Sequence, residues 1–166
     1  LGKRLPKHAF ASTFHACGFG AWRKACRSVR VQNDKVFNLS LNLFTDEERK
    51  QFGSMAVKAV SHAKNAGVGI LLDDKLSVWQ ELAERFDLEP SDEDIPLDVA
   101  LEKARELLSA SVESAMDHPS VIDFDDMLYM PLLDGAQFTG SDWLLVDEAQ
   151  DTNGVQLMML KKMLKP

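Results

Sequence analysis

Residues 143–146 form a short apolar run, Trp-Leu-Leu-Val, that stops at two carboxylates, Asp147 and Glu148. A continuous apolar run of this length is typical of a strand buried on both faces of a parallel sheet. Ligands of open α/β sheets bind beyond the carboxyl ends of such strands. The run therefore predicts an α/β fold with a ligand site at residues 147–148. The alternative for the two carboxylates alone is a helix cap at the strand exit.

Most of the remaining chain has the periodicity of helices, so the predicted fold is predominantly helical. Thr45 and Glu48 have the spacing of a capping box, which predicts a helix that begins there and ends at Gly67. Residues 45–118 are expected to form one continuous helical block. Within this block, helices are expected over residues 72–86 and 97–115, and outside it over residues 14–29 and 155–163. The segments between them are expected to be a short strand (8–13), irregular structure (31–44) and a loop (131–140).

The composition is that of an ordinary globular domain. The chain has 166 residues, of which 45% are hydrophobic and 27% charged, so a single domain with an insertion is expected. No apolar run reaches the ~18 residues of a membrane span, and no signal-peptide pattern opens the sequence. The two cysteines suggest neither a disulfide framework nor a metal site. We therefore expect no membrane partner and a cytoplasmic location.

Charge is distributed unevenly along the chain. The net charge is −7, but residues 1–35 carry eight basic side chains and one acidic one. Arg23, Arg27 and Arg30 lie in a segment whose apolar residues recur at helical spacing, which predicts a basic helix with an apolar back. This basic end is either an anion-binding face or a solvated helix face.

Three short motifs occur in a fixed order along the chain. They are Ser-Thr-Phe-His-Ala at 12–16, Ile-Asp-Phe-Asp-Asp-Met-Leu at 122–128, and Asp-Glu-Ala-Gln-Asp-Thr-Asn at 147–153. In sequence and order they resemble motif Ia, the segment before the Walker B strand, and the Walker B motif of superfamily 1A DNA helicases, the UvrD/Rep/PcrA family. The resemblance implies an ATP-driven enzyme that moves along single-stranded DNA and unwinds duplexes, as in DNA repair or replication.

The resemblance also implies roles for the residues of the third motif. Asp147 would bind Mg²⁺, usually through water, and Glu148 would be the catalytic base that deprotonates the attacking water. Gln150 and Asp151 would link the ATP site to neighbouring motifs. The implied cofactors are ATP and Mg²⁺.

The first motif implies a DNA contact. Thr13, Phe14 and His15 would lie beside single-stranded DNA, near its junction with the duplex, and Phe14 could stack on a base. Arg23, Arg27 and Arg30 could bind phosphates. Phe14 as a core residue and His15 as a packed histidine are equally open, and Asp123, Asp125 and Asp126 are interpreted as capping residues.

The resemblance divides the chain into three parts and shows what the sequence lacks. Residues 1–35 and 121–166 would belong to an incomplete RecA-like subdomain 1A with few parallel strands, and residues 36–120 to a helical insertion like subdomain 1B. No Gly-x-x-x-x-Gly-Lys-Ser/Thr loop is present. We therefore expect an internal piece of a bacterial or phage-type helicase that needs the rest of its chain for activity. The strand at 143–146 would then lack neighbours and expose apolar surface.

Two other functions stay open. One is a non-catalytic, helicase-like module that binds DNA or a protein, and the other is the motor part of a recombination helicase–nuclease. A metal-dependent nuclease built on Asp123, Asp125 and Asp126 has no distant partner residue in its favour.

Overall fold

The computed structural model describes residues 9–165, and about 60% of the chain is helical, with one pair of parallel strands. The expectation of a predominantly helical α/β fold is confirmed at this level. The elements are α1 (Phe14–Ala25), β1 (Val29–Val31), α2 (Lys35–Leu43), α3 (Asp46–Glu48), the π-helix η2 (Arg49–Gly53), α4 (Ser54–Ala66), α5 (Leu76–Phe86), α6 (Leu97–Met116), β2 (Ser120–Ile122), α7 (Asp126–Leu133), the 3₁₀-helix η3 (Ala149–Asp151) and α8 (Gly154–Met163).

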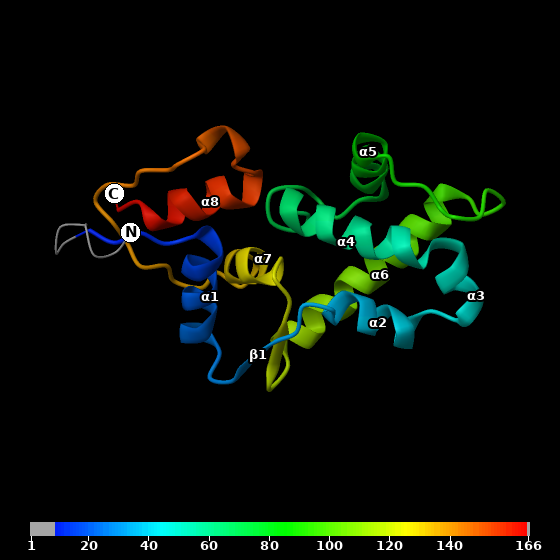
Figure 1. The fold of residues 1–166 in the computed structure, drawn as a ribbon, viewed down its shortest axis with the longest axis horizontal. Helices are drawn as coiled ribbons and strands as arrows, with labels where there is room; N and C mark the ends of the chain where they lie inside the picture. The colour runs from blue at the N-terminus through cyan, green and yellow to red at the C-terminus, as the bar shows by residue number, and fades with distance from the viewer. Residues whose placement is uncertain (1–8, 166) are drawn as a thin grey trace.

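Helices α2 to α6 form one side of the molecule, and α1, α7 and α8 form the other (Figure 1). The capping box of Thr45 and Glu48 is present, and Gly67 ends α4 with a φ of 82°. The apolar stripe that lies between them is buried in the larger core. Its residues are Phe52, Met55, Ala56, Ala59, Val60 and Ala63.

Strands β1 and β2 pair in parallel, with Val29 opposite Ser120 and Val31 opposite Ile122. β1 directly precedes α2 and β2 directly follows α6, so the helical block formed by α2 to α6 is inserted between two neighbouring strands. The indole of Trp22 donates a 3.0 Å hydrogen bond to Ser120 Oγ and ties α1 to this pair.

A second, smaller core holds α1, α7 and α8 together. Leu128, Leu132, Val155 and Met159 are buried there. Helices α1 and α7 approach closely because Gly18 has no side chain, and a Cβ at this position would lie 1.9 Å from the carbonyl oxygen of Met127. This contact holds α1, the helix that begins within the first motif, against the second motif.

The strand predicted at 143–146 is wrong. The segment has no regular structure, and the side chains of Trp143 and Leu145 are 88% and 99% exposed. A parallel strand needs neighbouring strands for its backbone hydrogen bonds, and β1 and β2 lie elsewhere, on the far side of α1 and α7 (Figure 1). Its nearest approach to sheet structure is an isolated bridge between Ser141 and Leu164.

Three other expectations differ from the structure. Residues 35–43 are helical, because Val36, Leu39 and Leu43 recur at helical as well as alternating spacing. α7 continues through the buried Pro131 to Leu133 instead of ending in a loop. Residues 9–13 have no regular structure, and His8 lies outside the described residues.

Candidate functional site

The carboxylate segment, residues 141–153, runs beside α8 from that helix's last turn back to its first (Figure 1). Its beginning is anchored because Ser141 N donates to Met163 O at 2.8 Å and Lys165 N donates to Ser141 O at 3.0 Å. Its end is anchored at Asn153, which caps α8. Between these anchors lie Asp147 and Glu148, both exposed.

Asp147, Glu148 and Gln150 come together in one turn. Glu148 adopts a left-handed backbone conformation with a φ of 50°, which costs a non-glycine residue about 1–3 kcal/mol. Its amide lies 3.2 Å from Asp147 Oδ1, and the amide of Gln150 donates to its carboxylate. The turn closes as Asp151 N donates to Glu148 O. Side chain and backbone therefore both orient Glu148.

The carboxylates of Asp147 and Glu148 would fit Mg²⁺ only if water and substrate phosphates supplied its other ligands. Across residues 9–165, no group of three or more histidine, cysteine, aspartate or glutamate side chains could hold a metal. Mg²⁺ commonly takes one or two carboxylates and completes its shell with water and substrate phosphates. Asp147 and Glu148 offer the hard oxygen ligands that such a site needs.

The first motif lies at the start of α1. Thr13 is the N-cap, and its hydroxyl accepts from Ala16 N at 3.2 Å. Phe14 is half-buried against the second core. The ring of His15 stacks on Phe124 with centroids 3.7 Å apart, and partial burial lowers its pKa against the attraction of Asp125. All three residues therefore have packing or capping contacts.

The three motifs meet around Asp125. Its carboxylate accepts hydrogen bonds from Ser61 Oγ at 2.6 Å and from Asn65 Nδ2 at 3.0 Å. Asn65 Oδ1 in turn accepts from Asn153 Nδ2 at 3.0 Å. Together with the His15–Phe124 stack, these contacts join α1, α4, the turn before α7 and the start of α8. Sequence reasoning missed Ser61 and Asn65, because nothing local marks them as partners of residues 60 to 88 positions away.

A buried charge cluster lies next to this meeting point. Lys64 Nζ lies 2.7 Å from carboxylate oxygens of both Asp123 and Asp126, and Lys35 pairs with Asp126 and donates to Ser111 O at 2.8 Å. Neither lysine was predicted from the sequence. The available signal was that Lys64 lies four residues after Val60, on the apolar face of its helix.

Burial and pairing act in opposite directions on these groups. Burial opposes ionisation of Asp126, but the attraction of Lys64 and Lys35 outweighs it and lowers the pKa of Asp126. Burial also lowers the pKa of Lys35, against the attraction of Asp126. Asp123 and Asp126 additionally cap each other's backbone, since Asp126 N donates to Asp123 Oδ1 at 2.8 Å and Asp123 N to Asp126 Oδ2 at 3.0 Å. The capping role expected of Asp123 and Asp126 is thus confirmed, whereas Asp125, at the N-cap of α7, makes no side-chain cap hydrogen bond.

The basic residues lie on the surface but not on one helix. Arg23 is exposed in the last turn of α1, whereas Arg27 lies in the following turn and Arg30 on β1. The predicted basic helix is therefore too long, since α1 ends at Ala25. Lys3, Arg4 and Lys7, which share the basic end of the sequence, lie outside the described residues.

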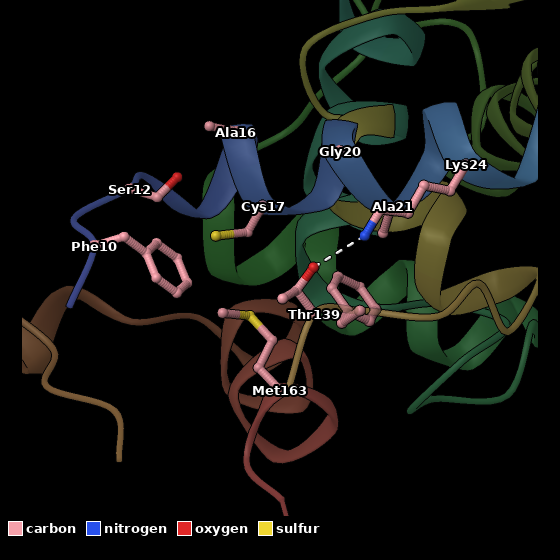
Figure 2. Close-up of a pocket in the computed structure, with 10 residues that line it drawn as sticks. Phe10, Ser12, Ala16, Cys17, Gly20, Ala21, Lys24, Thr139 and Met163 are labelled. Carbon is pink, nitrogen blue, oxygen red and sulfur yellow. Dashed lines mark hydrogen bonds between the residues drawn. The ribbon is translucent and has the colours of Figure 1, made fainter. Parts of the chain in front are cut away.

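A pocket of about 340 Å³ lies between α1 and the end of α8. Figure 2 shows Phe10, Cys17 and Met163 around this space, with Lys24 donating a 3.0 Å hydrogen bond to Thr139 at one edge. The lining is mostly apolar and includes none of the four predicted nucleotide-site residues. The pocket adjoins the first motif through Ser12 and is separate from the carboxylate turn.

Comparison with known proteins adds no relative, because no family model, no curated protein and no solved structure matches this chain. Within the described residues, no helix combines the length and the apolar character needed to cross a membrane.

Proposed function

We propose that this chain is part of an ATP-dependent DNA helicase motor of the superfamily 1A type. The observation that supports this most is the meeting of three helicase-like motifs around Asp125, although they lie up to about 140 residues apart in the sequence. An enzyme that couples ATP hydrolysis to movement on DNA needs its nucleotide-binding and DNA-binding motifs close together in the fold. Three chance matches in the sequence would not be expected to lie together.

In this proposal the carboxylate turn acts on ATP. Asp147 would hold Mg²⁺ through water, and Glu148 would accept a proton from the water that attacks the terminal phosphate. Gln150 orients Glu148 through the hydrogen bond between their side chains. Asp151 sets the turn that carries all of them. Mg²⁺, when bound with ATP, supplies charge neutralisation on the phosphates.

The exposed apolar segment fits the same proposal. Trp143 and Leu145 are nearly free of contacts, which is unfavourable for side chains of this size. In the proposed parent motor, the rest of the RecA-like core covers residues 143–146, and the same portion supplies the phosphate loop. Residues 1–35 and 121–166 then belong to that core, with residues 36–120 as the 1B-like insertion.

DNA would bind on the face that carries the first motif. Thr13, Phe14 and His15 lie at the start of α1, and three exposed arginines lie at or beyond its end: Arg23 in its last turn, and Arg27 and Arg30 after it. These arginines would pair with phosphates of single-stranded DNA near its junction with the duplex. A cytoplasmic location follows from this role and belongs to the proposal.

The experiment that tests this function measures ATP hydrolysis by the complete natural gene product, with and without single-stranded DNA. Strong stimulation by DNA is expected. Absence of hydrolysis by a well-folded protein would reject the motor. The same protein binding DNA or a protein partner without hydrolysis would then favour the non-catalytic module. A nuclease domain further along the gene would favour a recombination helicase–nuclease.

A further inference from the structure

We infer that Asn65 is a positioning residue that, through Asn153, ties the carboxylate turn to the helical block. The inference rests on the proposed function for its catalytic consequence, but the tie itself can be measured on this chain alone.

The carboxylate segment depends on few anchors. Among residues 9–165, one hydrogen bond joins residues 142–152 to another part of the chain. It is the exposed pair in which Lys165 Nζ donates to Asp142 Oδ1 at 3.1 Å. Within the described residues, the hydrogen bonds of the turn at 147–152 join only residues of that turn. Its position is therefore set by Ser141 at one end and by Asn153 at the other.

Asn153 uses its whole side chain. Its Oδ1 accepts from Gln156 N at 2.9 Å and caps α8, while its Nδ2 donates to Asn65 Oδ1 at 3.0 Å. Capping residues usually need only the oxygen. The second contact therefore serves a purpose beyond beginning the helix, which is to connect the end of the carboxylate segment to α4.

Asn65 is itself held in one orientation. Its Nδ2 donates to Ser61 O at 2.9 Å and to Asp125 Oδ1 at 3.0 Å, so its oxygen must face Asn153. A reversed amide would place oxygen against the Asp125 carboxylate and nitrogen against nitrogen. Asn65, Asp125 and Asn153 are all partly buried, which strengthens the hydrogen bonds between them.

The hydrogen-bonded series Asp125–Asn65–Asn153 thus links the second motif, the helical block and the third motif. Because His15 of the first motif stacks on Phe124, a shift of α1 on binding DNA would reach Phe124 by direct contact and Asp125 as its neighbour in the chain. A relay of this kind would pass DNA binding to the carboxylate turn without touching ATP. Couplings between sites are typically worth about 5- to 150-fold in affinity.

Two substitutions break the tie with little other damage. Asn153→Ser keeps an oxygen that can cap α8 but has no amide to reach Asn65. Asn65→Ala removes the middle of the relay from a different helix. Asn38→Ala is the matched control, because Asn38 is a half-buried asparagine on α2 with no side-chain hydrogen bond recorded within residues 9–165.

Amide hydrogen exchange on the 166-residue chain tests the tie. Asn65→Ala is expected to accelerate exchange several-fold at Gln156 and Leu157, whose amides bond to Asn153, and Asn38→Ala is not. The two substitutions together should add little to either alone. Unchanged exchange at Gln156 and Leu157 in Asn65→Ala would overturn the inference.

Steady-state hydrolysis by the complete gene product tests the consequence. Asn65→Ala is expected to lower kcat more with DNA than without it, and so to reduce the stimulation by DNA several-fold, with the KM for ATP preserved. Equal loss of kcat with and without DNA would show that Asn65 is merely structural and would overturn the positioning role. If the wild-type protein does not hydrolyse ATP, the proposed function fails, while the exchange result still decides whether the tie exists.

Discussion

The ammonium group of Lys64 lies 2.7 Å from the carboxylate of Asp126, and both side chains are withdrawn from solvent. Lys35 and Asp123 complete a cluster of two positive and two negative charges. This cluster fastens the start of α2, the end of α4 and the turn before α7 to one another, next to the meeting point of the three motifs.

Removing one charge from this cluster should be costly. Lys64→Met leaves two carboxylates facing one buried ammonium, and we expect a loss of about 3–5 kcal/mol in the free energy of unfolding. Combining it with Asp123→Asn restores the balance of charge and keeps an oxygen for the Asp126 amide, so the double variant should lose less than the sum of the single ones. Urea unfolding of the four proteins provides the test, and strictly additive losses would show that the charges are not coupled.

Two glycines of α1 should respond in opposite ways to alanine. At Gly18 the new methyl group would collide with the carbonyl oxygen of Met127, so Gly18→Ala should destabilise the protein by about 1–3 kcal/mol. A Cβ added at Gly20 would have no neighbouring atom within 4 Å. Because glycine is unfavourable inside a helix, Gly20→Ala should stabilise the protein by about 0.5–1 kcal/mol. Thermal unfolding of both variants distinguishes them. Equal effects would mean that α1 and α7 are not in close contact.

The buried Tyr129 should make the free energy of unfolding fall at alkaline pH. Burial, followed by the repulsion of Asp74 and Asp126, raises the pKa of Tyr129 to about 12, and its hydroxyl donates to Val68 O at 2.7 Å. Because this pKa exceeds the unfolded value of about 10, the stability from Tyr129 is complete below pH ~10 and is lost as the pH rises toward 12.

The titration of Tyr129 can be followed directly, because the chain has one tyrosine. Phenolate absorbance should appear only near pH 12 or together with unfolding, and Tyr129→Phe should flatten the fall in unfolding free energy above pH ~10. Ionisation near pH 10 in a protein that stays folded would refute the burial argument.

Salt dependence tests the proposed DNA face. Replacing Arg23, Arg27 and Arg30 together by glutamine should weaken binding of single-stranded DNA by the complete gene product. The slope of log affinity against log salt should fall by about 2, since each phosphate contact on a single strand contributes about 0.7. The control replaces Lys161 and Lys162, exposed in the last turn of α8. A slope unchanged by the arginine substitutions would move the DNA site elsewhere.

Features with local causes could be predicted from the sequence, and those with distant causes could not. The capping box of Thr45 and Glu48 was predictable because both partners lie within one turn. The irregular structure of residues 143–146 was not predictable, because an apolar run forms a strand only where neighbouring strands meet it. Lys64 finds its carboxylates 59 and 62 residues away, and Asn65 finds Asn153 88 residues away, so their pairing is a product of the fold.

The most direct test of the account concerns Glu148. In the complete gene product, Glu148→Gln keeps the size of the side chain and its contact with Gln150 but removes the base. ATP binding and single-turnover hydrolysis should be measured on the same preparation, with DNA present. The account predicts that ATP still binds and that hydrolysis is nearly abolished. Hydrolysis close to the wild-type rate would contradict the assignment of Glu148 as the catalytic base.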